Sequence, residues 1–280
     1  MRFSVVLVNY ASWPLTLRCI ESLYETGYEG FEVVVVDNDD GPVPEFPRPV
    51  SLIRNPSNLG FARACNAGLA ASTGEYVVLV NPDATVERDF FERFEDFLGD
   101  NGDVGIAGPR VLDEDGQVQL SARREVGAVS GLLGRTSLLT RLFPRSRAVR
   151  RLFPAATTPE GPTEVDWVSG ACMVLRRRML EEVGGLDGRF FMYFEDADLC
   201  RRARGSGWLV LYLLGVSVTH RAGGSSRSSA RAVWHLHRSA FLYHRKHGPH
   251  GPLNLYTPVV AAGLALRALA KLAASYLGRR

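Results

Sequence analysis

The sequence predicts an α/β protein whose central sheet is mostly parallel and covered by helices on both faces. Apolar, β-branched runs alternate with amphipathic segments over the first hundred residues, as expected for strands that alternate with helices. Polar residues also follow three of the predicted strands, as Asn9 and Tyr10, as Asp37 and Asn38, and as the segment 81–83. Because ligands of such sheets bind at the carboxyl ends of the strands, we expect a binding site along this edge.

The first elements follow in order along the chain. Residues 3–8 predict a buried strand, and Ser12 and Gly27 bound an amphipathic helix as its N-cap and its stop. Residues 32–36 predict a second strand and, after the proline-rich loop 42–49, residues 51–53 a short third strand. A helix over 60–71 that Gly74 stops, a strand over 76–80 and an amphipathic helix over 87–98 complete the alternation.

The second half of the chain has a looser pattern. A segment without acidic residues covers 126–159, a denser region follows over 163–220, and the tail from Trp234 onward predicts helices broken near 248–252. We therefore divide the chain into a main domain over 1–225, with halves 1–108 and 109–225, and a helical appendage over 226–280.

Composition excludes several classes of protein. The formal charge is 33 − 30 = +3, too small to indicate nucleic-acid binding. The four cysteines form no C-x-x-C pair, and neither a signal peptide nor an apolar run long enough to span a bilayer is present. We expect a cytoplasmic location with reduced thiols, so that any contact with the inner face of the plasma membrane is peripheral.

Nucleotide binding, if present, uses neither a P-loop nor a complete glycine-rich dinucleotide fingerprint, since the sequence contains neither. Asn81, Pro82 and Asp83 follow a hydrophobic strand instead. A carboxylate there suits Mg²⁺ or Mn²⁺ that also binds diphosphate oxygens. The alternative is a turn that caps the next helix.

The segment 190–198 places Glu195, Asp196 and Asp198 directly after an aromatic run, at the start of a predicted helix. Acidic residues are common in the first turn of a helix, where the dipole favours them. An aromatic surround would also shield one carboxylate from water and make it an effective base, and we favour this second interpretation.

Two further features each have two interpretations. His220 follows a predicted strand, and such a histidine either forms a structural hydrogen bond or binds Mn²⁺. The helix that begins at Gly60 carries Arg63 in its first turn. Its N-terminus either meets phosphate or packs tightly on the sheet.

Taken together, these segments resemble the family-2 glycosyltransferases, and specifically the bacterial rhamnosyltransferase-like branch. The resemblance covers residues 3–247, and no single motif in it is specific. Its strength lies in the order of the matching segments, which are 4–10, 35–38, 58–68, 81–84, 170–177, 183–187, 191–201, 207–208 and His220 with 224–226.

The resemblance implies a GT-A fold in which residues 1–108 form the nucleotide-binding half and residues 109–225 the acceptor half, with a basic loop over 126–159. Asp37 would then read the pyrimidine base of the donor. The other nucleotide-binding residues implied are Asn9, Tyr10, Asn58, Gly60, Arg63 and Asn81.

The resemblance also implies the catalytic roles. Asp83 and His220 would bind Mg²⁺ or Mn²⁺. Both would be needed, because Asn81 stands where many relatives carry aspartate, and an amide oxygen is a weaker metal ligand than a carboxylate. Asp196 would deprotonate the acceptor hydroxyl in a single displacement that inverts the anomeric centre. Glu195 would help to position the base or the acceptor, and the acceptor-side residues would be Trp167, Gly170, Tyr193 and Asp198.

The resemblance favours L-rhamnose from dTDP-rhamnose as the donor, with a UDP-sugar such as UDP-galactofuranose as the alternative. The acceptor would be a saccharide, free or linked to polyprenyl diphosphate, in cell-surface polysaccharide synthesis. Two other classes fit less well. A sugar-nucleotidyltransferase needs a glycine- and arginine-rich turn after the first strand, and a non-catalytic carbohydrate-binding or scaffold protein would have lost catalytic carboxylates that this chain retains.

Two features bear on membranes and assembly. The arginines and leucines of 126–159 and the apolar helix 258–277 suit contact with anionic lipid headgroups. The alternative is a basic loop over the active site and a helix packed on the domain. A homodimer through residues 228–280 is a further hypothesis.

Overall fold

The computed structural model describes residues 1–124, 161–221, 230–248 and 257–277. The basic segment 126–159, residues 224–226 of the resemblance and the proposed boundary after residue 225 lie outside these ranges. Within the described ranges, no helix has the length and apolar character needed to cross a membrane. All four cysteines are buried and free, as expected for structural thiols.

One sheet forms the centre of the molecule, and its strands lie in the order β3-β2-β1-β4-β10-β6-β11-β5. The first four strands are parallel to one another, β10 runs antiparallel between β4 and β6, and β6 is parallel to β11. The mostly parallel sheet is therefore confirmed. The bounds of these strands are β1 Phe3–Asn9, β2 Phe31–Asp37, β3 Ser51–Arg54, β4 Tyr76–Val80, β5 Ala84–Val86, β6 Val104–Leu112, β10 Cys172–Arg176 and β11 Leu209–His220.

Two short pairings complete the strand structure. Strand β8 (Thr163–Glu164) pairs with β11, and β7 (Ala122–Arg123) pairs with β9 (Trp167–Val168) in a separate two-stranded sheet. The small sheet brings residues near position 123 and position 167 together.

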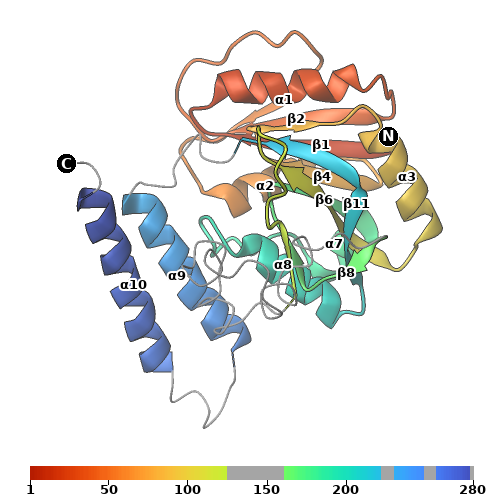
Figure 1. Cartoon of the computed structure of the whole chain (residues 1–280). Coiled ribbons are helices and arrows are strands. Elements are labelled where there is room, and N and C mark those ends of the chain that lie inside the picture. The colour runs from red at the N-terminus through yellow and green to blue at the C-terminus, as the bar shows by residue number, and fades with distance from the viewer. Residues whose placement is uncertain (125–160, 222–229, 249–256, 278–280) are drawn as a thin grey trace.

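Helices cover both faces of the central sheet, because alternate residues of each strand point to opposite sides. In β1, Val5 and Leu7 pack with helices α1 (Trp13–Glu25) and α3 (Phe90–Asp100). Val6 and Val8 pack on the other side with α2 (Phe61–Ala71), α7 (Arg177–Val183) and α8 (Glu195–Gly205). Figure 1 shows the two layers of helices on either side of the sheet.

The C-terminal helices form a hairpin beside this core. Helix α9 (Ala230–His247) and helix α10 (Thr257–Leu277) lie side by side, with α10 at the outer edge of the molecule (Figure 1). The predicted helical tail is confirmed, and α9 ends at His247, next to the predicted break near 248–252, most of which lies outside the described residues.

The predicted elements agree with the structure to within a few residues. The helix expected from Gly60 begins at Phe61, because Gly60 has a φ of +85° that a helix does not accept. The helix expected over 87–98 begins at Phe90. Ser12 occupies the predicted N-cap position, but its hydroxyl donates to Asn9 Oδ1 and does not cap the helix.

Candidate functional site

The carboxyl ends of β1 and β2 meet at a buried pair of polar side chains. Asn9 lies opposite Asp37 in the parallel register, and its Nδ2 donates to Asp37 Oδ1 at 2.9 Å. Asn9 Oδ1 accepts hydrogen bonds from Ser12 and Thr16 at the start of α1. The amide of Asn9 is thus oriented from both sides and holds the carboxylate of Asp37 in place.

The second carboxylate oxygen of Asp37 has room for a further hydrogen bond. The residue is fully buried, and its Oδ2 accepts no hydrogen bond from the described residues. Arg54 Nε lies 3.4 Å from this oxygen. Since buried polar atoms are nearly always paired in proteins, Oδ2 suits an N–H donor of a bound ligand. Tyr10, half-exposed at the same edge, can flank such a ligand.

The turn at Asn58 joins this edge to a distant part of the chain. Asn58 Oδ1 accepts a hydrogen bond from Gly60 N at 2.9 Å. A Cβ on Gly60 would lie 2.6 Å from the Phe191 carbonyl oxygen, so this close approach requires glycine. The first N–H of α2, at Phe61, donates to the same carbonyl, which binds the turn to the segment before Asp196.

Arg63 is directed toward that segment as well. Its Nε donates to the Gly188 carbonyl at 3.1 Å. Of the two interpretations of this helix start, the structure therefore favours packing for Phe61 N and Arg63 Nε. Contact between Arg63 and a nucleotide stays a prediction.

Asp83 and His220 come together although 137 residues separate them in the sequence. β11 pairs with β5 so that His220 lies opposite Ala84, and His220 Nε2 lies 3.1 Å from Asp83 Oδ1. The Asn81 amide lies 3.4 Å from the same imidazole nitrogen. On the other side of the ring, Gln119 Oε1 lies 3.4 Å from His220 Nδ1. A contact with the second ring nitrogen, such as this one, orients an imidazole that binds a metal.

This pair fits a divalent cation in its donor types and in its spacing. Carboxylate oxygen and imidazole nitrogen both bind Mn²⁺. Two ligands about 2.1 Å from an ion and at right angles to each other lie about 3 Å apart, close to the spacing of Asp83 Oδ1 and His220 Nε2. In the described parts of the chain no three His, Cys, Asp or Glu side chains gather around one point. A cation here would need its remaining ligands from a substrate or water.

Asp196 lies in the first turn of α8, with its carboxylate held by backbone. Its Oδ2 accepts from Gly170 N at 2.9 Å and its Oδ1 from Ala197 N at 2.7 Å. Burial raises the pKa of Asp196 above the ordinary value, and these two backbone hydrogen bonds oppose the shift. The result is a carboxylate with a fixed orientation and increased basicity, as a general base requires.

Two aromatic and basic neighbours complete the surroundings of Asp196. The Trp167 indole N–H makes no hydrogen bond of normal geometry, yet it lies near enough to lower the pKa of Asp196. Arg123 lies over the Trp167 ring at 5.0 Å and also favours the charged carboxylate. The small sheet of β7 and β9 therefore brings Trp167 next to Asp196, and an acceptor-side role of Trp167 stays a prediction.

Glu195 is nearly inaccessible and is held differently from its neighbour. Its side chain is buried, and Oε2 has no hydrogen-bond partner among the described residues. Burial raises the pKa of Glu195 well above the ordinary value, and the charge of Asp196 raises it further. Glu195 thus favours the protonated form beside Asp196, which leaves Asp196 to carry the negative charge.

Adjacent backbone groups connect the segment that contains Asp83 with Asp196. Ala171 O accepts from Asn81 N at 3.0 Å, and Gly170 N donates to Asp196 Oδ2. One turn before β10 thus contacts both the 81–83 segment and the first turn of α8. The structure brings the two predicted centres to the same region at the ends of β4 and β10.

The aromatic segment before Asp196 adopts a strained backbone. Tyr193 and Phe194 have φ values of 72° and 69°, which are rare for residues other than glycine. Such strain costs on the order of 1–3 kcal/mol per residue and persists where surrounding contacts impose it. Tyr193 and Phe194 directly precede α8, so the strained backbone lies next to Glu195 and Asp196.

Those contacts come from α9, which the sequence did not connect with the site. The His235 ring stacks on Phe191 at 4.3 Å, Ser239 Oγ donates to Met192 O at 2.8 Å, and Tyr243 packs on Phe194. The residues 235, 239 and 243 recur at every fourth position, so they share one helix face. The spacing of these residues in the sequence indicates a buried helix face, but it does not show which segment that face packs against.

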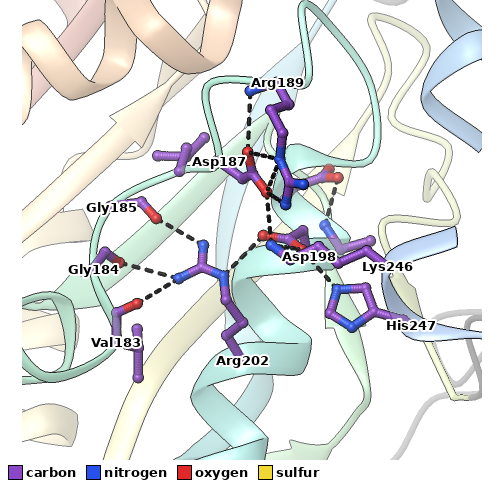
Figure 2. Close-up of polar contacts among 12 residues, drawn as sticks. Val183, Gly184, Gly185, Asp187, Arg189, Asp198, Arg202, Lys246 and His247 are labelled. Atoms are coloured by element: carbon purple, nitrogen blue, oxygen red, sulfur yellow. Dashed lines mark hydrogen bonds and ion pairs between the residues drawn. The ribbon is translucent and has the colours of Figure 1, made fainter. Parts of the chain in front are cut away.

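Asp198, which the resemblance assigned to the acceptor side, is occupied by a buried cluster of ion pairs, so its role toward the acceptor stays a prediction. It is fully buried and accepts hydrogen bonds from Arg202 Nε at 2.8 Å and His247 Nε2 at 2.7 Å. Lys246 Nζ lies 2.6 Å from it and 2.8 Å from Asp187. Figure 2 shows the two carboxylates around Lys246, and Arg202 reaching the carbonyls at the end of α7. Asp198 therefore anchors α9 to α7 and α8.

Comparisons with known proteins point to one family. The profile of the family described as "Glycosyl transferase family 2" matches residues 4–184. The chain is 32% identical over 262 residues to N-acetylglucosaminyl-diphospho-decaprenol L-rhamnosyltransferase of Mycobacterium tuberculosis H37Rv, with 85% of this chain and 82% of the relative covered. It is 39% identical to the rhamnosyltransferase WbbL of Escherichia coli K12, over 29% of this chain and 31% of WbbL.

Solved structures support the fold. A mannosyltransferase of Pyrobaculum calidifontis, in complex with GDP-Man and Mn²⁺, superposes with a TM-score of 0.60 at 20% identity, covering 99% of this chain and 74% of its own. TarS of S. aureus in complex with UDP-GlcNAc superposes with a TM-score of 0.56 at 15% identity, covering 96% and 73%. At these identities the likeness concerns the fold, and it confirms the expected GT-A architecture.

Proposed function

The chain belongs to glycosyl transferase family 2, and from this premise we propose that it transfers L-rhamnose from dTDP-rhamnose to a saccharide linked to a lipid diphosphate. The transfer proceeds by a single displacement with inversion and depends on Mg²⁺ or Mn²⁺. We place it on the cytoplasmic side of the plasma membrane, where nucleotide sugars and the lipid-linked acceptor meet.

The observation that carries this proposal is the turn at 170–171. It contacts the 81–83 segment, with its carboxylate and imidazole, on one side and Asp196 on the other. A donor diphosphate at the first centre and an acceptor hydroxyl at the second would then lie on opposite sides of one anomeric carbon. That arrangement supports in-line attack.

Asp196 serves as the base in this scheme. Its carboxylate removes the proton of the acceptor hydroxyl as the oxygen attacks the anomeric carbon, and the bond to the diphosphate breaks in the same step. Because one base and one displacement are involved, the anomeric configuration inverts. The protonated form of Glu195, which burial favours, keeps a second negative charge away from the attacking oxygen.

The nucleotide binds along the ends of β1 and β2. Asp37 Oδ2, buried and without a hydrogen bond, accepts from an N–H of the pyrimidine base, with Tyr10 at its edge. Asp83 and His220 hold the cation, whose chemistry when bound is to neutralise negative charge on the diphosphate leaving group. Asn81 orients His220 from one side and Gln119 from the other.

The choice of sugar and acceptor rests on relatives. The M. tuberculosis relative is named for L-rhamnose transfer to N-acetylglucosaminyl-diphospho-decaprenol, and it aligns with 85% of this chain. We extend this donor and this class of acceptor to the present protein. A UDP-sugar is the second candidate, since the pyrimidine contact proposed for Asp37 suits uracil as well as thymine.

A panel of donors tests the function. We expect release of dTDP from dTDP-rhamnose only when Mn²⁺ or Mg²⁺ and a polyprenyl-diphosphate-linked saccharide are both present. UDP release from a UDP-sugar would transfer the assignment to the second candidate. Failure of every dTDP- and UDP-sugar with such acceptors would contradict the proposed function.

We expect Asp83→Ala to weaken Mn²⁺-dependent binding of dTDP by about a hundredfold, because a metal ligand contributes several kcal/mol to a diphosphate site. Calorimetric titration of dTDP with and without Mn²⁺ measures this effect without turnover. Asp89→Ala is the matched control. Asp83 directly precedes β5 and Asp89 follows it, but Asp89 forms an exposed ion pair with Arg93. Equal loss of Mn²⁺-dependent binding in both variants would remove Asp83 from the metal site.

A further inference from the structure

The outer face of α10 is apolar and uncovered. Val259, Leu266 and Leu269 are 70%, 68% and 63% exposed, and Ala262 is exposed between them. Their spacing of three, four and three residues places them on one side of the helix. Among residues 257–269, 271 and 272 of α10, no exposed position carries a charged or hydrogen-bonding side chain. Large uncovered apolar surface of this kind marks an interaction site.

The charged residues of α10 lie on the other side, toward α9. Arg267 and Lys271 are partly buried, and their charges lower the pKa of His237 on α9, after burial as the larger cause. Thr257 at the start of α10 contacts His244 near the end of α9. The two helices therefore pack antiparallel, and the apolar stripe faces away from the protein, as Figure 1 shows for α10 at the molecular edge.

Helix α9 adds a second exposed stripe with a different character. Arg231, Trp234, Arg238 and Arg245 are all exposed, with Trp234 at 65%. Their spacing of three, four and seven residues again defines one helix side. Tryptophan and arginine are the side chains that favour the boundary between lipid headgroups and acyl chains.

The charge of the hairpin distinguishes between a second copy of the chain and an anionic bilayer as its partner. The hairpin, residues 230–277, contains six arginines and lysines and no aspartate or glutamate. A second copy that covers both helices would bring the exposed Arg231, Arg238 and Arg245 of the two copies together, which disfavours a homodimer through this surface. An anionic surface is attracted, by about 1 kcal/mol per basic residue close to it. An apolar stripe beside basic and aromatic residues fits an anionic bilayer.

We propose that the α9–α10 hairpin is a membrane-docking element that lies in the interface of an anionic lipid bilayer, with the outer stripe of α10 inserted and the arginines of α9 among the headgroups. The exposed stripes run along both helices, so the contact is parallel to the surface. This docking depends only on the surface of the hairpin and not on which sugar is transferred.

A consequence for catalysis follows, and it rests on the proposed function. The face of α9 with His235, Ser239 and Tyr243 holds the segment before Asp196. The helix that touches the membrane is thus the helix that supports the base. Docking fixes the height of Asp196 above the bilayer, where the diphosphate of a lipid-linked acceptor lies.

Vesicle flotation of the full chain tests the proposal. We expect binding to phosphatidylcholine vesicles that contain phosphatidylglycerol, weak binding to phosphatidylcholine alone, and a decrease with added salt. We expect the double variant Leu266→Gln, Leu269→Gln to bind about a hundredfold more weakly, because each inserted leucine contributes roughly tenfold or more. Trp234 fluorescence should shift to the blue with vesicles, and Trp234→Phe should remove that shift.

Val118→Gln is the matched control, because Val118 is exposed at 44% on the main domain and should leave vesicle binding unchanged. Circular dichroism and titration of dTDP with Mn²⁺ in solution check that the variants are folded, so loss of docking is distinguishable from failure of the proposed function. Indifference of the wild type to both vesicles overturns the proposal. So does equal binding of wild type and double variant, or a wild-type dimer in light scattering that the double variant converts to a monomer.

Discussion

Asp196→Asn is expected to lower the rate of sugar transfer by about three to four orders of magnitude, within the range that a general base contributes. The asparagine retains the size of the side chain and an oxygen that can accept from Gly170 N, but it cannot take up a proton. Donor binding should persist, since the nucleotide contacts proposed for Asp37 and Asp83 lie elsewhere. Single-turnover transfer and dTDP titration measure the two properties separately.

The pH profile adds an independent check on Asp196. Burial raises its pKa, so the folded protein holds this proton more tightly than the unfolded chain. The acid limb of the transfer rate should therefore lie above the value near 4 of an exposed aspartate. Because an asparagine has one oxygen, Asp196→Asn keeps only one of the two backbone hydrogen bonds, and circular dichroism checks that the variant is folded. Asp115→Asn, in an exposed loop, is the control, and transfer by Asp196→Asn within tenfold of wild type would place the base elsewhere.

Asp198→Asn is expected to lower the free energy of unfolding by about 3–5 kcal/mol, the range observed when one partner of a buried ion pair is removed. The variant leaves Arg202, Lys246 and His247 around a neutral amide in a fully buried position. The contacts of α9 with the segment 191–194 should loosen with it, so transfer falls as well. Urea denaturation measures the loss, and hydrogen exchange of α9 locates it.

The direction of the pKa shift of Asp198 determines how its contribution to stability changes with pH. Burial opposes ionisation of Asp198, but the hydrogen bonds from Lys246, Arg202 and His247 prevail and lower its pKa. Its stabilising contribution is therefore present above the ordinary carboxyl pKa near 4 and lost as the pH falls through the lower folded value. Asp166→Asn is the control, since Asp166 pairs with Arg204 near the surface and should cost less than about 1 kcal/mol. Similar losses in both variants would contradict a structural anchor at Asp198.

Much of the fold was predictable from local sequence. The strand over 76–80 is found at the predicted residues, and the first two strands differ by about one residue at each end. These strands are buried on both faces, so their continuous apolar runs carry an unambiguous signal. The Asp83–His220 contact was expected only through the resemblance, because β5 and β11 bring it about by long-range pairing.

The buried ion pairs of Asp198 and the contacts of α9 escaped the sequence analysis for a common physical reason. Asp198 and Arg202 are four residues apart on α8, a spacing that favours an ion pair on one helix, and this local signal argued against an acceptor role. The remaining partners, Lys246 and His247, come from almost fifty residues away. A helix pattern shows that α9 has a face to bury, but only tertiary packing shows that the face supports the segment before Asp196.

The anomeric configuration of the product tests the central claim most directly. After incubation of the protein with dTDP-rhamnose, Mn²⁺ and a polyprenyl-diphosphate-linked N-acetylglucosamine, mass spectrometry identifies the transferred sugar, and NMR determines its anomeric configuration. The site described above, with one base at Asp196 and one displacement, predicts a single added rhamnose with the configuration opposite to that of the donor. A product that retains the donor configuration, or an acceptor recovered without rhamnose, would contradict it.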